Sequence, residues 1–173
     1  MFEYLVTARY LHIHPEKAED FVNYLFVQMR TVREQAQKIH GKDYVTTEYR
    51  ELVEKNFDRV RERFTYLMKD GRVKTKSRWV DTGIVDMATE SGLSQFIILA
   101  YYHPIEKTHP SALFLLNRQD QKEETVSQTL MISHRMIIEL LILQREHFGV
   151  NELKPLIGQC LQDFDEIWKR YKT

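Results

Sequence analysis

The least ordinary chemistry in this sequence lies in the stretch "GRVKTKSRW", where cations alternate with uncharged residues. The cations are Arg72, Lys74, Lys76 and Arg78. If this stretch is a strand, side chains at i and i+2 share a face, so all four charges lie on one side, roughly 7 Å apart. That spacing is within a factor of about two of the phosphate spacing of an extended nucleic acid. Further cations lie just upstream, at Arg59, Arg63 and Lys69. The pattern fits either of two interpretations: a surface for an anionic partner, or a solvated edge strand whose charges discourage aggregation.

Two histidines separated by one isoleucine, His12 and His14, end the N-terminal apolar run just before Pro15. On a strand both would point the same way, and two neutral imidazoles could share one divalent cation. A third ligand would have to come from elsewhere in the chain. The alternative is that both histidines are structural and face solvent or cap the end of the strand.

The His-Ile-His arrangement resembles the HUH motif of rolling-circle replication and transposition nucleases. The resemblance implies a divalent metal bound by His12 and His14, and a tyrosine on a later helix, often within YxxK, that attacks a DNA phosphate. This chain contains "YLMK", from Tyr66 to Lys69. On a helix, Tyr66 would lie off the apolar stripe and share a polar face with Arg59 and Lys69, where its hydroxyl could act as a nucleophile.

A third group of polar residues lies inside the apolar stretch "LMISHRMIIELLIL". Arg135 and Glu139 are four residues apart and can pair on one face of a helix, which would satisfy two charges in apolar surroundings. The alternative is a pocket in which Glu139 and His134 act as base or ligands. The sequence contains neither a glycine-rich phosphate loop nor a G-x-S-x-G nucleophile motif.

The composition is that of an ordinary globular chain. Its 173 residues are 43% hydrophobic and 29% charged, and the formal net charge is zero. A globally basic nucleic-acid binder is therefore excluded, although a local basic patch is not. Cys160 is the single cysteine, so an intramolecular disulfide is excluded. Because the N-terminal run carries Glu3 and Arg9, and the apolar runs are short, we expect a cytoplasmic protein without membrane contact.

Helical periodicity dominates two parts of the chain. It extends from Pro15 to Gly41, and again from Thr46 or Thr47 to Asp70-Gly71, which predicts a long antiparallel helical hairpin. The stripe assigned to the core in the first helix is Ala18, Phe21, Val22, Leu25, Met29, Val32, Ala36 and Ile39. Two further helices are expected, from about Gln119 to Phe148 and from about Glu152 to Tyr171. The former is apolar almost all the way round, so we expect it to be buried on most sides.

Strands are expected elsewhere. Phe2 to His14 is rich in aromatic and β-branched residues, which predicts an N-terminal strand. Later candidates are Val73–Val80, Ile84–Ala88 and Gln95–Tyr102, while "ALFLL" is ambiguous between strand and helix. The predicted fold class is therefore α+β, in one domain over residues 1–173. It comprises an N-terminal strand, a long helical hairpin, an antiparallel sheet of about four strands and two C-terminal helices.

These patterns predict a small intracellular binding or regulatory protein that is not an enzyme. It would contact an anionic partner, with nucleic acid the leading candidate, through the basic strand. One alternative is a divalent-metal-dependent, HUH-like enzyme that nicks single-stranded DNA with Tyr66. The other is a protein-interaction module, such as a homodimer formed through the helical hairpin, without nucleic-acid contact.

Overall fold

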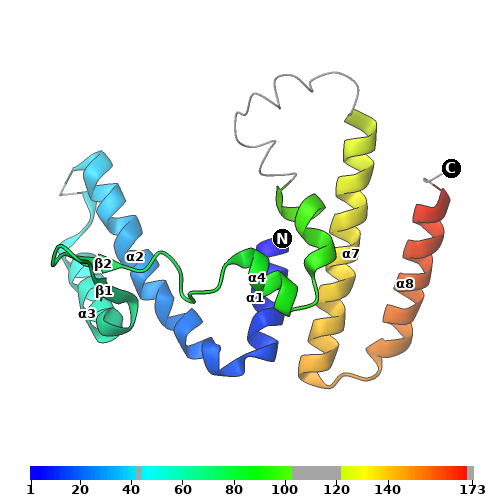
Figure 1. Cartoon of the computed structure of the whole chain (residues 1–173), viewed down its shortest axis with the longest axis horizontal. Coiled ribbons are helices and arrows are strands. Elements are labelled where there is room, and N and C mark those ends of the chain that lie inside the picture. Colours follow the sequence, from blue (N-terminus) through cyan, green and yellow to red (C-terminus); the bar gives the residue numbers. More distant parts are fainter. Residues whose placement is uncertain (42–43, 103–121, 171–173) are drawn as a thin grey trace. The chain divides into compact units, whose positions relative to one another are not determined.

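The computed structural model describes residues 1–41, 44–102 and 122–170, whose helices and strands are labelled in Figure 1. They belong to two compact units. The split unit combines Met1–Ile13 with Thr82–Thr173, and the inserted unit is the continuous segment His14–Asp81. The expectation of a single domain over the whole chain stays a prediction.

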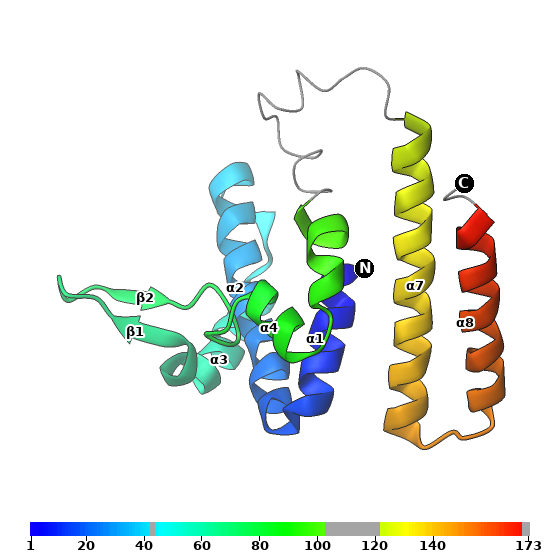
Figure 2. The ribbon, with the colours of Figure 1, turned by 45° about the vertical axis from the view of Figure 1, so that its right-hand side comes forward.

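All the regular elements among the described residues of the split unit are helical. Its elements are α1 (Phe2–Ile13), α4 (Ile84–Glu90), the 3-10 turn η3 (Ser94–Phe96), the π-helical turn η4 (Ile97–Tyr102), α7 (Lys122–Phe148) and α8 (Leu153–Arg170). Helix α1 packs against α4 and α7, and α8 packs along α7 to form a second helical hairpin (Figure 2). Leu5 and Val6 of α1 are fully buried at the centre of this packing, together with Ile138 of α7.

The inserted unit consists of a helical hairpin followed by a β-hairpin. Its elements are the 3-10 turn η1 (Pro15–Lys17), α2 (Ala18–His40), α3 (Thr47–Phe64), β1 (Thr65–Leu67) and β2 (Val73–Thr75). Thr46 caps α3, since its hydroxyl accepts a hydrogen bond from the Tyr49 amide at 3.3 Å. The core between α2 and α3 is formed by Tyr24, Val27, Phe57, Val60 and Phe64, with Phe26 and Trp79 packed against it.

The predicted fold class is wrong, because the protein is mostly helical and its one sheet has two strands among the described residues. The predicted N-terminal strand, Phe2 to His14, is helix α1 as far as Ile13. Its buried side chains are Phe2, Leu5, Val6 and Tyr10. These positions recur at three- to four-residue intervals and form one helical face, whereas a half-buried strand would bury every second residue.

The predicted antiparallel sheet of about four strands is also wrong. Only the first three residues of Val73–Val80 form a strand, and Ile84–Ala88 lies in α4. Gln95–Tyr102 lies in η3 and η4. Short, continuously apolar runs suit a buried helical turn as well as a buried strand, which explains the error. The ambiguous "ALFLL" stretch lies outside the described residues.

Long helices do occupy the segments where the sequence has helical periodicity, but two details differ. Helix α3 ends at Phe64 rather than at Asp70-Gly71, because the chain turns into β1. Helix α7 is less enclosed than we expected, since Val126, Leu130 and Ile137 are exposed.

Candidate anion-binding hairpin

The β-hairpin places an aromatic ring and a cation side by side. Tyr66 of β1 lies directly opposite Lys74 of β2 in the antiparallel register. The hydrogen-bonded ladder extends beyond both strands: the Lys76 amide donates to the Phe64 carbonyl at 2.8 Å, and the Met68 amide donates to the Arg72 carbonyl at 2.8 Å. Directly opposite residues project from the same face of a two-stranded sheet. Since Tyr66 and Lys74 are both exposed, that face presents a phenol beside an ammonium group.

The turn of the hairpin neutralises one of the predicted cations. Gly71 has a φ of 79°, a conformation that glycine adopts with little strain. The Asp70 carboxylate accepts hydrogen bonds from the Arg72 amide at 3.1 Å and from Arg72 Nε at 2.8 Å. The side-chain bond, and then the backbone bond, hold the pKa of Asp70 below its ordinary value. The Arg72 guanidinium therefore stabilises the turn by pairing with Asp70, and its charge is largely neutralised.

Two other predicted cations also have carboxylate partners. Arg63 Nη1 lies 2.9 Å from Glu19 and 3.2 Å from Asp20, and the hydrogen bond to Glu19 is the main cause of a raised Arg63 pKa. Lys76 Nζ lies 3.4 Å from Asp81. Within the described parts of the chain, the predicted cations without an ion pair are Arg59, Lys69, Lys74 and Arg78. The net positive charge of the patch is therefore smaller than the sequence suggests.

A shallow pocket of about 220 Å³ brings several predicted residues together at the base of the hairpin. It is lined by Tyr66, Lys76, Ser77, Arg78, Val80 and Asp81. Two hydroxyls, an ammonium and a guanidinium are the donors that bind phosphate oxygens in proteins. The buried Tyr24 fixes the backbone here, because its hydroxyl donates to the Lys76 carbonyl at 3.1 Å, and burial raises the Tyr24 pKa.

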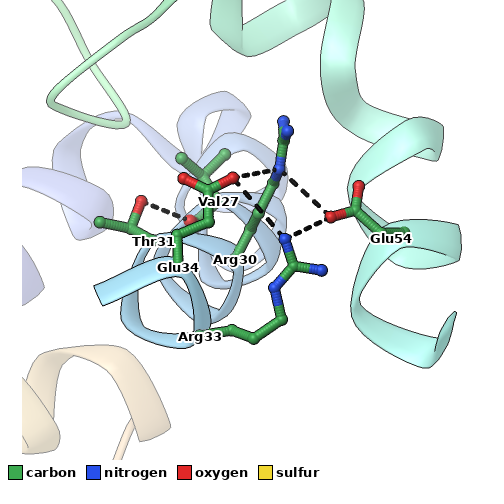
Figure 3. Close-up of polar contacts among 6 residues, drawn as sticks. All are labelled: Val27, Arg30, Thr31, Arg33, Glu34 and Glu54. Atoms are coloured by element: carbon green, nitrogen blue, oxygen red, sulfur yellow. Dashed lines mark hydrogen bonds and ion pairs between the residues drawn. The ribbon is translucent and has the colours of Figure 1, made fainter. Parts of the chain in front are cut away.

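An ionic network that the sequence analysis did not single out joins α2 to α3 (Figure 3). Arg33 Nη2 lies 2.6 Å from Glu54, and Arg30 Nε lies 2.9 Å from Glu34 and 3.5 Å from Glu54. The Arg30 guanidinium also stacks over the Phe57 ring at 4.2 Å. The four-residue spacing of Arg30 and Glu34 was the sequence signal for part of this network. Arg30 and Glu34 also line a second cavity, of about 210 Å³, with Thr65, Val73 and Thr75.

The two histidines predicted to bind a metal, His12 and His14, do not lie on a strand. His12 lies in α1 with its ring 5.9 Å from that of His147, whereas His14 precedes η1 with Nδ1 3.6 Å from Glu16. Side chains two residues apart on a helix diverge, so the argument from a shared strand face does not apply. Among the residues whose side chains the structure describes (1–41, 44–102 and 126–169), no three or more His, Cys, Asp or Glu side chains are arranged to hold a metal ion.

The remaining predicted residues lie as follows. Tyr66 lies on a strand, whereas the nuclease resemblance implied a helix. In α7, Arg135 Nη2 and Nε donate to Glu139 Oε1 at 2.9 and 3.2 Å, which gives the ion pair that the spacing suggested. The Glu139 side chain is the more buried of the two, so this pair stabilises a carboxylate inside the helical packing.

One segment among the described residues, Val126–Phe148 in α7, is long and apolar enough to cross a bilayer. Of the apolar window, 22% is buried in the structure. Core helices of water-soluble proteins can meet the same criterion, so a single segment of this kind is weak support for a membrane location. The expected absence of membrane contact stays a prediction.

Comparison of the chain with protein-family models, with curated proteins and with solved structures found no match in any of the three.

Proposed function

We propose that this protein binds single-stranded nucleic acid through the face of the β1–β2 hairpin that carries Tyr66 and Lys74, without catalysing a reaction on it. The observation that carries the proposal is the position of these two exposed side chains directly opposite one another in the hairpin. An exposed aromatic ring can stack on an unpaired base of any sequence, and a neighbouring cation can neutralise the adjacent phosphate.

Two further cations extend this surface along the chain. Lys69 lies in the turn segment, and Arg78 lines the pocket that also contains Tyr66. Neither has an ion pair with a described residue. With Lys74 they give about three phosphate contacts, which position a strand without reading its sequence. A single strand fits better than a duplex, because the faces of paired bases are stacked inside the helix and are closed to Tyr66.

We propose a cytoplasmic location for this activity. Helix α7 packs against α1 and α8 and carries Arg135 and Glu139 within its apolar segment, and such charged side chains are costly in the hydrocarbon core of a bilayer.

The test is a fluorescence-polarisation titration of a labelled single-stranded oligonucleotide with the full chain at about 50 and about 200 mM salt. Three phosphate contacts on a single strand give a slope of about −2 in log K against log salt, so binding should weaken about 20-fold over this range. A duplex of the same length should bind more weakly. Absence of binding at the lower salt concentration, or equal binding of the duplex, would contradict the proposal.

Variants separate stacking from charge. Tyr66→Ala should weaken binding about 5- to 150-fold, whereas Tyr66→Phe, which keeps the ring, should bind almost normally. Lys74→Glu should weaken binding and make the salt slope shallower by at least about 0.7. The matched charge reversal Lys154→Glu lies on α8, which belongs to the split unit and not to the unit that contains the hairpin, and it should change neither quantity. If Lys154→Glu weakens binding as much as Lys74→Glu does, the hairpin is not the binding surface.

A further inference from the structure

Helix α2 has a second apolar face that its own unit leaves open. This face carries the apolar stripe between Ala18 and Ile39 that the sequence analysis assigned to the core. The buried residues of α2 are instead Tyr24, Val27 and Arg33, which lie outside that stripe. Four large members of the stripe are more than half exposed: Val22 at 61%, Leu25 at 51%, Val32 at 67% and Ile39 at 71%. Helix α3 covers the side with Tyr24 and Val27, so α2 has apolar residues on two faces and a neighbour in its own unit on one of them.

The spacing of the open face is that of a coiled-coil seam. Its members are Ala18, Val22, Leu25, Met29, Val32, Ala36 and Ile39, which alternate at intervals of four and three residues. A stripe facing the core of a globular unit is usually broader and follows a period near 3.6, whereas this alternation keeps a period of 3.5 over three heptads. The seam contains no charged residue and is about 32 Å long. Such a row is the surface that a second helix covers by knobs-into-holes packing.

The side chains of the seam complement one another when two copies of α2 run antiparallel. With the midpoint between Met29 and Val32, Leu25 lies opposite Ala36, and Val22 lies opposite Ile39. Each layer of the interface then pairs two side chains of different size. In one of these layers, the large Leu25 fills the space left by the small Ala36. A parallel pair would instead put Ala36 against Ala36 and leave a gap in that layer.

The charges of α2 also favour the antiparallel arrangement. Its first turn carries Glu19 and Asp20, and its last turn carries Lys38 and His40. Antiparallel copies bring the acidic end of each helix beside the basic end of the other, and they also oppose the two helix dipoles favourably. Arg63 pairs with Glu19 and Asp20 and reduces this attraction without reversing it.

We propose that the open face of α2 is a homodimer interface, in which a second copy of this chain packs its own α2 antiparallel along Ala18–Ile39. The two α2–α3 hairpins then form a four-helix assembly. This interface is distinct from the β-hairpin proposed to bind nucleic acid, so each proposal can fail without the other.

The first experiment is sedimentation equilibrium of the full chain over a range of concentrations. The proposal requires a monomer–dimer equilibrium, and a strict monomer at every concentration overturns it. Leu25→Glu should raise the dimer dissociation constant at least about tenfold, because it buries an unpaired charge in each copy. Leu156→Glu is the matched control, since Leu156 is 63% exposed on α8, and it should leave the dimer intact. Dissociation by Leu156→Glu alone would place the interface on α8 and overturn the proposal.

A second variant and a crosslinking experiment keep the test independent of folding. Val32→Glu replaces a more exposed seam residue and should also dissociate the dimer while the helical circular dichroism is retained. In a Cys160→Ser background, Val22→Cys alone and Ile39→Cys alone should not form disulfide-linked dimers, whereas an equimolar mixture should. Efficient crosslinking of Val22→Cys with itself would show a parallel pair and overturn the antiparallel arrangement.

Discussion

Replacement of Glu54 by glutamine should lower the free energy of unfolding of the inserted unit by about 2 kcal/mol. The Arg33 side chain is only 8% exposed, and its Nη2 atom lies 2.6 Å from Glu54 Oε1 (Figure 3). Without that carboxylate, the guanidinium keeps the Glu34 carboxylate, at the longer distance of 3.7 Å. Loss of one member of a fully buried ion pair costs about 3–5 kcal/mol. We expect less here, because the Glu54 side chain is 38% exposed and water can replace part of the lost interaction.

The same substitution at Glu34 is the internal control. Glu34 pairs with Arg30 at 2.9 Å, but its side chain is 52% exposed, so Glu34→Gln should cost about 0.5 kcal/mol or less. The double variant Arg33→Met with Glu54→Met should recover most of the loss, because both charges leave the buried site together.

Urea unfolding followed by tryptophan fluorescence measures this effect. In a Trp168→Phe background, the remaining tryptophan is Trp79, which packs against the core of the inserted unit and therefore reports on that unit. A loss of about 2 kcal/mol should shift the midpoint by roughly 1–2 M urea for a unit of this size. A shift no larger for Glu54→Gln than for Glu34→Gln would refute the assignment of Arg33 as a buried charge that depends on Glu54.

Three further predictions concern the β-hairpin and its attachment. Tyr24→Phe removes the hydrogen bond from the Tyr24 hydroxyl to the Lys76 carbonyl and should lower the stability measured in the same urea assay by about 0.5–1.5 kcal/mol. The Asp70 pKa measured by NMR titration should lie below 3.8 and return toward that value in Arg72→Ala, and no change in the variant would contradict the assigned hydrogen bonds. Because the folded-state pKa is the lower one, the contribution of this turn to stability is present above the unfolded pKa and is lost as the pH falls through the folded value. Gly71→Ala should destabilise the hairpin by about 1–2 kcal/mol, since alanine is strained at a φ of 79°, and NMR shifts of the strand amides would show the loss.

The sequence located the long helices better than the strands because their periodicity extends over many residues. Helix α2 begins just after Pro15 and ends at Gly41, where the chain has a φ of 92°. The first helix was missed for a physical reason: aromatic and β-branched residues are common in strands, but the buried Phe2, Val6 and Tyr10 follow one another at the four-residue interval of a helix. Spacing was the better guide in this segment, and residue type was misleading.

The sequence predicted which cations lie in the candidate site, but it did not predict which of them are paired with carboxylates. Alternation in the sequence indicated that Lys74 lies on a strand, and β2 contains it. Alternation could not reveal that Glu19 and Asp20 of α2 reach Arg63, or that Asp81 reaches Lys76, since these carboxylates are brought near by tertiary packing. The cross-strand pairing of Tyr66 with Lys74 was equally hidden, because Tyr66 was expected on a helix.

The division of the split unit has a consequence for the order in which the newly made chain can fold. Arg9 of α1 pairs with Glu146 near the end of α7 at 3.1 Å, across 137 positions of the sequence. At typical rates of synthesis, roughly 7–30 s separate these two residues as they are made. During that interval Leu5 and Val6, which are fully buried in the finished protein, have not yet met α7. The inserted unit is continuous in sequence, so we expect it to fold on the ribosome before α1 can pack against α7.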